Sequence, residues 1–299
     1  MLDRAITRTT PYIAMLPAYA AAFVGYLGSI GWMIYISFTA SKSLPKYELV
    51  GTYQYERLFQ TTRWLISLEN MFLIAVGVIA LTLALGTLLA IALDQHVSGE
   101  SVFRTIFLYP YAMSLVVTGI AWQWLLNPQH GLAAILEGIG LDFFDSNILN
   151  RPDLALWAIV IACVWQGAGL TVVIILSALR SVDNDLWRIA KVEGIPAWRM
   201  YVSVVLPMLR PAFYTASFLM LLGVVSLYEL VLALTGGGPG ISTEVPTKFI
   251  MDYLFQRGNI GLAAAACVTL LAIIAVCGLV FLMLRNRVAL NRGLDRSAS

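Results

Sequence analysis

Long apolar stretches alternate with short polar breaks along the whole sequence. A bilayer core about 30 Å thick requires about 20 apolar residues from a helix that crosses it. Six stretches reach that length, and each is bounded by charged residues or by clusters of Gly, Pro or Asn. The pattern predicts an all-α membrane protein with six transmembrane helices, at residues 11–39, 70–93, 105–126, 153–179, 208–235 and 261–284.

The breaks divide the chain into three predicted regions. Residues 1–65 contain an N-terminal tail, the first helix and a loop, residues 66–285 form a membrane core, and residues 286–299 form a tail. The apolar run from Tyr12 to Phe38 is longer than the roughly 7–15 apolar residues of a signal peptide. We therefore expect the first helix to remain as a membrane span.

Composition supports a membrane protein and argues against several other classes. Of 299 residues, 60% are hydrophobic and 12% are charged, against about 45–50% and about 25% in soluble domains. A net charge of +2 gives no reason to expect a nucleic-acid partner. Three Cys residues without paired spacing and two isolated His residues indicate neither a disulfide framework nor a metal site.

Basic residues are distributed unevenly between the two sets of polar breaks. The N-terminus, the breaks at 94–104 and 180–210, and the C-terminal tail hold 12 of the 19 Lys and Arg residues, and the other three breaks hold 7. Because positive charge marks the cytoplasmic side, both termini and the 180–207 segment are predicted to be cytoplasmic.

The 180–207 segment has the composition of a helix–turn–helix. Asp183 can cap a helix that runs through Val192, and Gly194 permits a turn. A second helix is expected from Ala197, closed by Leu206-Pro207.

The second of these helices is predicted to have an apolar stripe. Trp198, Tyr201, Val202 and Val205 follow the i, i+3, i+4, i+7 spacing, and no part of the chain is evident that would cover them. Such a stripe suits docking into an apolar groove of a partner, and the alternative is a helix that rests on lipid.

This segment resembles the coupling loop of ABC importer permeases, which carries an EAA-type pattern. The match rests on the spacing of Glu193-Gly194, Val204, Leu206-Pro207 and Pro211. Two positions differ, because Arg188 stands where the family usually has Glu, and Asp183 stands where a Pro is frequent. The resemblance implies an ATPase-coupling role for Arg188, Ala190, Glu193, Gly194, Pro196, Trp198, Tyr201, Leu206 and Pro207.

Two further motifs resemble the sugar branch of that family, the maltose and glycerol-phosphate type of permease. One is Leu234-Thr235-Gly236-Gly237-Gly238-Pro239 followed by Ser242-Thr243-Glu244, and the other is Trp122-Gln123-Trp124 with Asn127-Pro128 and Gly131. The resemblance covers roughly residues 60–285 and implies the type I ABC importer permease fold, with a sugar as the transported solute.

The resemblance also implies the partners and the location. They are a second permease, two ATPase subunits, an extracytoplasmic solute-binding protein and membrane lipid, in a multi-pass assembly of the bacterial cytoplasmic membrane. The sequence contains no G-x-x-x-x-G-K-[ST] phosphate loop. We therefore expect no cofactor in this chain, with ATP and Mg bound by the partner ATPase, and transport by alternating access without enzyme chemistry.

Glu229 is the principal candidate for the substrate path. A carboxylate inside an apolar stretch normally faces a polar cavity or a partner, and Ser226 lies three residues before it, on the same predicted helix face. Its alternative role is structural, near a hydrated interface. Further candidates are Tyr228, Trp122, Trp165 and Gln166, although core packing is the alternative for the two Trp residues.

Three other functions remain open on the sequence. A permease for a phosphorylated polyol would be expected to place Arg deep in the cavity, and the interior of the apolar stretches holds none, since Arg210 lies at the edge of the 208–235 stretch. A secondary transporter usually shows inverted repeats, which are not evident here. An intramembrane enzyme would need paired acids, a Ser/His pair or a metal cluster at membrane depth.

The charge distribution generates a prediction about topology. A reporter fused after Arg287 should give a cytoplasmic signal, and one inserted within 240–257 should give an extracytoplasmic signal. The reason is that 12 of the 19 basic residues lie in the polar breaks on the same side of the membrane as the N-terminus. The opposite pattern would overturn both the orientation and the placement of the 180–207 segment.

Overall fold

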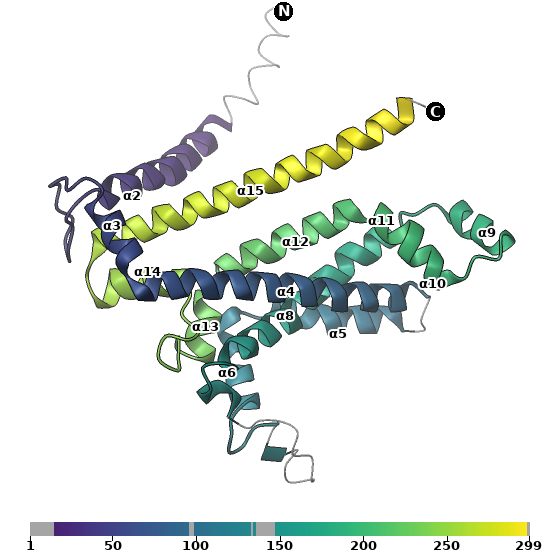
Figure 1. Cartoon of the computed structure of the whole chain (residues 1–299), viewed down its shortest axis with the longest axis horizontal. Helices are drawn as coiled ribbons and strands as arrows, with labels where there is room; N and C mark the ends of the chain where they lie inside the picture. Colours follow the sequence, from purple (N-terminus) through teal and green to yellow (C-terminus); the bar gives the residue numbers. More distant parts are fainter. Residues whose placement is uncertain (1–14, 96–98, 133, 136–146, 298–299) are drawn as a thin grey trace, which may run out of the picture. The chain divides into compact units, whose positions relative to one another are not determined.

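The computed structural model describes residues 15–95, 99–132, 134–135 and 147–297, with side chains described as far as residue 283. The chain divides into two compact units, one made of residues 1–62 and 250–273, the other of 63–249 and 274–299. The described elements are helices (Figure 1), and the extended segments contribute only two isolated β-bridges, Thr39–Leu49 and Lys42–Leu44.

Four described helices are long and apolar enough to cross a membrane, at Met15–Ser37, Thr62–Asp94, Ala155–Leu179 and Ile260–Met283. Two bent pairs pass the same test, Glu100–Ala112 with Leu115–Leu125 and Ala197–Met208 with Arg210–Val225. The count reaches the predicted six when each bent pair is taken as one span.

Three predicted helix boundaries need correction. The 105–126 helix is two helices, α5 (Glu100–Ala112) and α6 (Leu115–Leu125), which meet at 101°. The 208–235 helix is α12 (Arg210–Val225) and α13 (Tyr228–Leu234), separated at Ser226-Leu227. The second span is α4 (Thr62–Asp94), which begins before the predicted residue 70 because polar residues such as Arg63 and Asn70 find partners within the protein.

The smaller unit contains η1 (Phe23–Gly28), α2 (Ser29–Ser37), α3 (Tyr53–Gln60), η4 (Asp252–Gln256) and the first part of α15 (Ile260–Ser297). Its centre is a close backbone contact, in which a Cβ at Gly261 would lie 2.6 Å from the Thr39 carbonyl oxygen. The Gln54 amide donates a hydrogen bond to the same oxygen over 2.9 Å. Gly261 therefore lets α15 approach the extended segment after α2.

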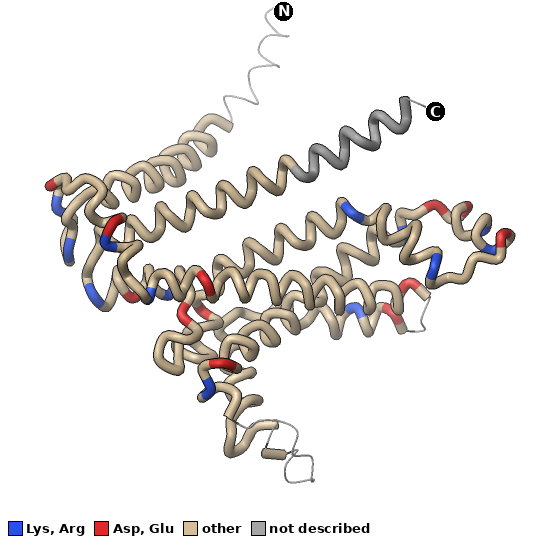
Figure 2. The backbone as a smooth tube through the Cα atoms, in the orientation of Figure 1, with Lys and Arg blue, Asp and Glu red and all other residues tan. Residues whose placement is uncertain are grey.

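The larger unit adds α8 (Ala155–Leu179) and several short helices, and it contains two buried apolar clusters. The short helices are η2 (Ile148–Asn150), α9 (Asn184–Val192), α10 (Ala197–Met200), η3 (Tyr201–Val205), α11 (Leu206–Met208) and α14 (Pro246–Met251). In Figure 2 the charged residues of this unit gather toward the ends of its long helices, as a lipid-facing bundle requires.

Glycines allow the helices of this unit to pack closely. A Cβ at Gly86 of α4 would lie 2.6 Å from the Thr171 methyl of α8, and Gly169 of α8 lies directly against the Phe107 carbonyl of α5. A Cβ at Gly119 of α6 would lie 2.6 Å from the Ala233 Cβ of α13. Small residues at such contacts are typical of membrane helix pairs, where close approach replaces the hydrophobic driving force.

Residues 235–245, here called the Gly-rich loop, are fixed to the first turns of α4 by a buried ion pair. Arg63 Nη2 donates to Glu244 Oε1 over 2.7 Å, Glu244 is 1% exposed, and Lys248 Nζ lies 3.7 Å from its other oxygen. The Asn70 amide donates to the carbonyl oxygens of Ser242 and Glu244. The loop is thus held by side-chain bonds from a helix distant in sequence.

Glu244→Gln tests this attachment. The substitution keeps the shape but removes the charge that faces Arg63 and Lys248, and breaking one member of a buried pair costs about 3–5 kcal/mol. Hydrogen exchange of the loop amides should rise sharply. Asp153→Asn is the control, because the Arg151–Asp153 pair is half exposed or more and such pairs contribute only about 0–1 kcal/mol. Unchanged exchange in Glu244→Gln would contradict the role of the pair.

Candidate functional site

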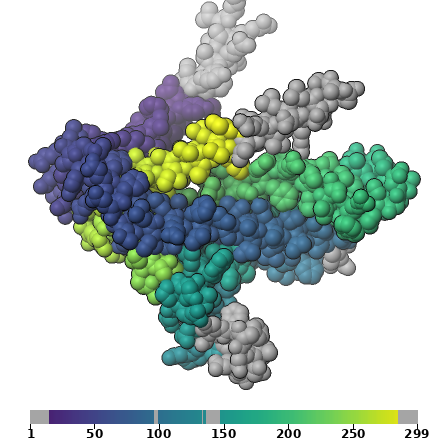
Figure 3. Space-filling model, in the orientation of Figure 1, coloured from purple at the N-terminus to yellow at the C-terminus, as the bar shows by residue number. Residues whose placement is uncertain are grey.

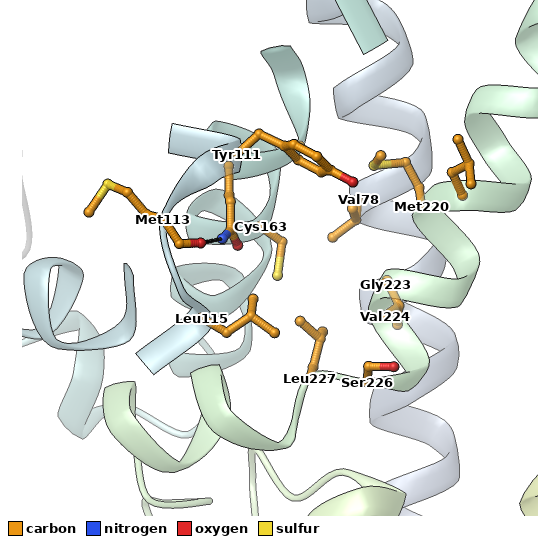
Figure 4. Close-up of a pocket in the computed structure, with 13 residues that line it drawn as sticks. Val78, Tyr111, Met113, Leu115, Cys163, Met220, Gly223, Val224, Ser226 and Leu227 are labelled. Carbon is orange, nitrogen blue, oxygen red and sulfur yellow. Dashed lines mark hydrogen bonds between the residues drawn. The ribbon is translucent and has the colours of Figure 1, made fainter. Parts of the chain in front are cut away.

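A cavity of about 350 Å³ lies within the larger unit, at the two places where its helices are interrupted. The α5–α6 break contributes Met113 and Leu115, and the α12–α13 break contributes Ser226 and Leu227. Figure 4 shows these side chains around one space, with Cys163 from α8 and Val78 from α4 on the remaining sides. The cavity is therefore built from two broken spans and two continuous ones.

Each break is stabilised by polar side chains. Gln166 Nε2 of α8 donates to the Met113 carbonyl over 3.0 Å, and the Ser114 hydroxyl caps α6 by accepting a hydrogen bond from the Val117 amide. At the other break, the Ser226 hydroxyl donates to the Leu222 carbonyl over 3.3 Å. Interrupted backbone at membrane depth is tolerated where it is buried in protein or lines a cavity, and both breaks meet that condition.

The lining is mostly apolar, with few polar groups. Gln166, Ser226 and the Tyr111 side chain are the polar contributors, and Lys, Arg, Asp and Glu do not occur among the described residues that line the cavity. A space of this kind can hold a neutral solute by a few hydrogen bonds and by contact with apolar surface.

The structure places the six predicted path residues in different surroundings. Gln166 and Ser226 line the cavity, whereas Glu229, Tyr228, Trp122 and Trp165 are outside its lining. Glu229 is exposed in the first turn of α13, and the α12–α13 break separates it from Ser226, so the predicted shared helix face was wrong. Trp122 and Trp165 contact each other edge to face at 6.0 Å, and Trp122 packs against a buried cluster.

Sequence reasoning missed the other lining residues, above all Tyr111, Met113 and Met220. A signal for the first two was present, because Pro110 and Ser114 flank them, and Ser favours a helix N-cap. Met220 carried no local signal, since its position on α12 is one of several equivalent apolar positions.

Residues 183–208, here called the coupling segment after the role that the sequence resemblance implies, form the predicted helix–turn–helix. The Asp183 carboxylate accepts a hydrogen bond from the Asp185 amide at the start of α9. Gly194 has φ +67°, the Ile195 amide donates to the Ala190 carbonyl and the Gly194 amide to the Lys191 carbonyl. These bonds form a Schellman turn, in which the positive φ favours glycine.

The end of the second helix differs from the prediction. The helix continues through Leu206-Pro207, and the 67° bend comes at Leu209. Pro207 follows the π-helical turn η3 (Tyr201–Val205), whose wider hydrogen-bond register accommodates a residue that has no amide donor.

The predicted apolar stripe is divided between the protein interior and the surface. Tyr201 and Val205 are 8% and 0% exposed, packed in a cluster with Leu93 of α4 and Leu176 of α8, so the prediction that the chain leaves them uncovered was wrong. Trp198 and Val202 are 69% and 60% exposed. The exposed apolar side chains that flank the Gly194 turn are those of Ile189, Val192, Ile195, Trp198 and Val202, and Met208 is exposed at the end of the segment.

The other predicted coupling residues are accounted for. Ala190 is buried, Glu193 and Pro196 are exposed on either side of Gly194, and Leu206 and Pro207 are half-buried. Arg188 Nη1 pairs with Asp185 Oδ1 over 3.0 Å on the surface. Nearby, Arg180 donates to Glu100 over 2.7 Å, and this bond raises the pKa of the guanidinium.

Broken spans around a cavity, together with an exposed apolar helix–turn–helix, are the features of a membrane permease, and they match the ABC importer permeases that the sequence motifs resemble. Comparison with known proteins identifies the family. Residues 82–290 match the family described as "Binding-protein-dependent transport system inner membrane component". The chain belongs to this family, and it is a multi-pass permease subunit of a transport system rather than an enzyme.

Individual relatives agree with this assignment. A probable ABC transporter permease protein of Pyrococcus horikoshii is 34% identical, over 89% of this chain and 93% of its own length. The xylose/arabinose import permease of Haloferax volcanii is 27% identical, over 90% and 85%. A bacterial alginate ABC transporter, solved in complex with an alginate pentasaccharide-bound periplasmic protein, has the same fold, with TM-score 0.80, 21% identity and coverage of 95% and 97%.

The predicted resemblance and the type I importer fold are thereby confirmed. Family membership also sets aside the secondary transporter and the intramembrane enzyme as alternatives.

Gln166→Leu tests the contribution of the cavity. The variant keeps a side chain of similar size but removes the amide that bonds the Met113 carbonyl. We expect uptake by the intact transporter to fall by roughly tenfold at normal membrane levels, since an unsatisfied buried carbonyl costs about 1–3 kcal/mol. Gln123→Leu is the control, because Gln123 is exposed on α6 and is not part of the cavity lining. Equal uptake by the two variants would contradict the prediction.

Proposed function

We propose that this chain moves a sugar or sugar-like solute across the membrane by alternating access. The observation that supports this most directly is the cavity at the two helix breaks, whose uncharged lining offers hydrogen bonds from Gln166 and Ser226 beside apolar surface. Sugars present both hydroxyl groups and apolar C–H faces. A relative that imports xylose and arabinose and a structural neighbour that transports alginate favour the same class of solute.

The cavity argues against a phosphorylated polyol, the alternative within the same family. Phosphate groups are recognised by the planar fork of Arg, which bonds two oxygens at once. Among the described residues no Arg or Lys lines the cavity. A neutral solute therefore suits this chain better.

Glu229 and the aromatic residues are proposed to act before the solute reaches the cavity. Glu229 is exposed on α13, three residues beyond Ser226, and Tyr228 is half-buried beside it. Trp122 and Trp165 form an edge-to-face pair, and Trp165 is 38% exposed. A carboxylate and aromatic faces are suited to hold sugar hydroxyls and C–H surfaces along an approach path.

Energy is proposed to come from a separate ATPase that docks on the coupling segment. Five exposed apolar side chains flank the turn at Gly194, and the sequence has no phosphate-binding loop of its own. Burying side chains such as Val192, which is 86% exposed, contributes about 1.5–3 kcal/mol each to docking. ATP and Mg would then be bound by that partner.

The complete transporter is proposed to contain a second permease, two ATPase subunits and an extracytoplasmic solute-binding protein, in a bacterial cytoplasmic membrane. The structural neighbour was solved with a periplasmic protein that carries an oligosaccharide, which supports a binding protein as the source of solute. The family description supports the location.

Alternating access follows from the two interruptions. Beyond the breaks, α6 and α13 pack closely at Gly119, so these two short helices can move together. On the other side of the breaks, α5 and α8 are joined at Gly169. Movement at Met113-Ser114 and Ser226-Leu227 would open and close the cavity. Binding of ATP to the ATPase would favour one of the two states because the docked ATPase makes different contacts with the permease in each state.

Uptake by the assembled transporter in vesicles tests the proposal. With the binding protein outside and ATP inside, a panel of radiolabelled pentoses, hexoses, oligosaccharides and a phosphorylated polyol should give accumulation of at least one neutral sugar. Accumulation of the phosphorylated compound alone would overturn the proposed substrate class.

Gly194→Val tests the coupling segment. A β-branched residue at φ +67° is strained and would reorient the exposed apolar face, so the ATPase should dissociate on gentle purification and uptake should be lost. Gly278→Val is the control, because Gly278 lies in α15 with open space around its Cα. A Gly194→Val transporter that retained its ATPase and parental uptake would contradict the proposed docking role.

A further inference from the structure

One helix, α4, is hydrogen-bonded at both ends to the two segments that face opposite sides of the membrane. It runs without a break from Thr62 to Asp94, a length of about 50 Å for 33 residues. Figure 3 shows α4 as a continuous ridge along one face of the larger unit, with the coupling segment at one end. Val78, between the ends, lines the cavity.

At the cytoplasmic end, α4 packs against the coupling segment through Leu93, and the Tyr201 hydroxyl adds hydrogen bonds to this apolar contact. Tyr201 donates to Asp94 Oδ2 over 3.2 Å and accepts a hydrogen bond from Gln95 Nε2 over 2.8 Å. The Tyr201 ring is held edge-on by Trp187 of α9, with ring centroids 5.0 Å apart. Tyr201 thus joins α9, the following helix and the end of α4 at one point.

At the opposite end, α4 is bonded to the Gly-rich loop. Arg63 and Asn70, both on α4, bond the Glu244 carboxylate and the carbonyl oxygens of Ser242 and Glu244. A Cβ at Gly237, where φ is +92°, would lie 2.8 Å from the Lys248 side chain. The loop is therefore packed tightly where α4 holds it.

The covalent route from the coupling segment is poorly suited to carry a displacement that far. It leads into α12, with a bend of 67° at Leu209 and a second interruption at Ser226-Leu227. Bends of this kind absorb movement. By contrast, α4 has no interior proline or break, so a push at Asp94 is transmitted along its axis.

We propose that Tyr201 is a positioning residue that fastens the coupling segment to α4, through which displacement of the coupling segment reaches the Gly-rich loop. This proposal rests on the proposed ATPase docking. The hydroxyl is the essential group, because the buried ring alone would pack equally well as phenylalanine.

Tyr201→Phe tests the proposal in the assembled transporter, since it removes the hydroxyl and keeps the ring. A fluorophore on Ile241→Cys, in a background whose three native cysteines are replaced, reports movement of the exposed part of the Gly-rich loop. The parental protein should give an ATP-dependent signal. In Tyr201→Phe that signal and the number of sugar molecules imported per ATP hydrolysed should fall by roughly ten- to hundredfold, the loss expected for one hydrogen bond to a charged group.

Tyr214→Phe is the matched control, because the Tyr214 ring packs edge-on against Phe281 and its hydroxyl has no hydrogen bond among the described residues. It should behave as the parent. Gln95→Ala removes a bond to the same hydroxyl from an exposed position and should lower both readouts without disturbing the core. A double variant of Tyr201→Phe with Asp94→Asn should fall no further than the worse single variant.

An ATP-dependent signal and a sugar-to-ATP ratio equal to the parent's in both Tyr201→Phe and Gln95→Ala would overturn the proposal. The fluorescence readout requires ATP but no solute. A transporter that imports no sugar, yet loses its ATP-driven signal in Tyr201→Phe, would therefore overturn the proposed substrate and support the role of Tyr201.

Discussion

Backbone polar groups inside a bilayer must find partners within the protein, and this constraint decides where the chain can be interrupted. The two interruptions, at Met113-Ser114 and Ser226-Leu227, line the same cavity, and side chains bond the backbone at each. The Gln166 amide is central, because it reaches from α8 to the carbonyl that the end of α5 exposes. The polar groups that stabilise the broken helices are thus the groups that a solute would meet.

Close packing at glycines determines which helices move as one body. Gly119 joins α6 to α13, Gly169 joins α8 to α5, and Gly86 joins α4 to α8. Because a methyl group at any of these positions would meet a neighbour at 2.6 Å or less, the three contacts admit little sliding. Flexibility is left to the breaks between the pairs, where the cavity lies.

The sequence predicted the features that depend on residues adjacent in the chain, such as the spans and the turns. Apolar length indicated the spans, and Gly194 indicated the turn, at which the structure has a positive φ. Long-range features had no local signal. The Arg63–Glu244 pair joins residues 181 positions apart, and the burial of Tyr201 depends on Leu93 and Leu176, which belong to other helices. Periodicity revealed an apolar stripe but could not tell which part of it another helix covers.

The division of the coupling segment into an inward and an outward apolar face has an evolutionary consequence. Tyr201 and Val205 must fit the buried cluster of this chain. Val192 and Trp198 are exposed, so this chain's own packing does not restrict them. The cavity draws its lining from neither group. Substitutions can therefore accumulate independently at three sets of positions, namely those packed inside the chain, those that line the cavity and those that face outward.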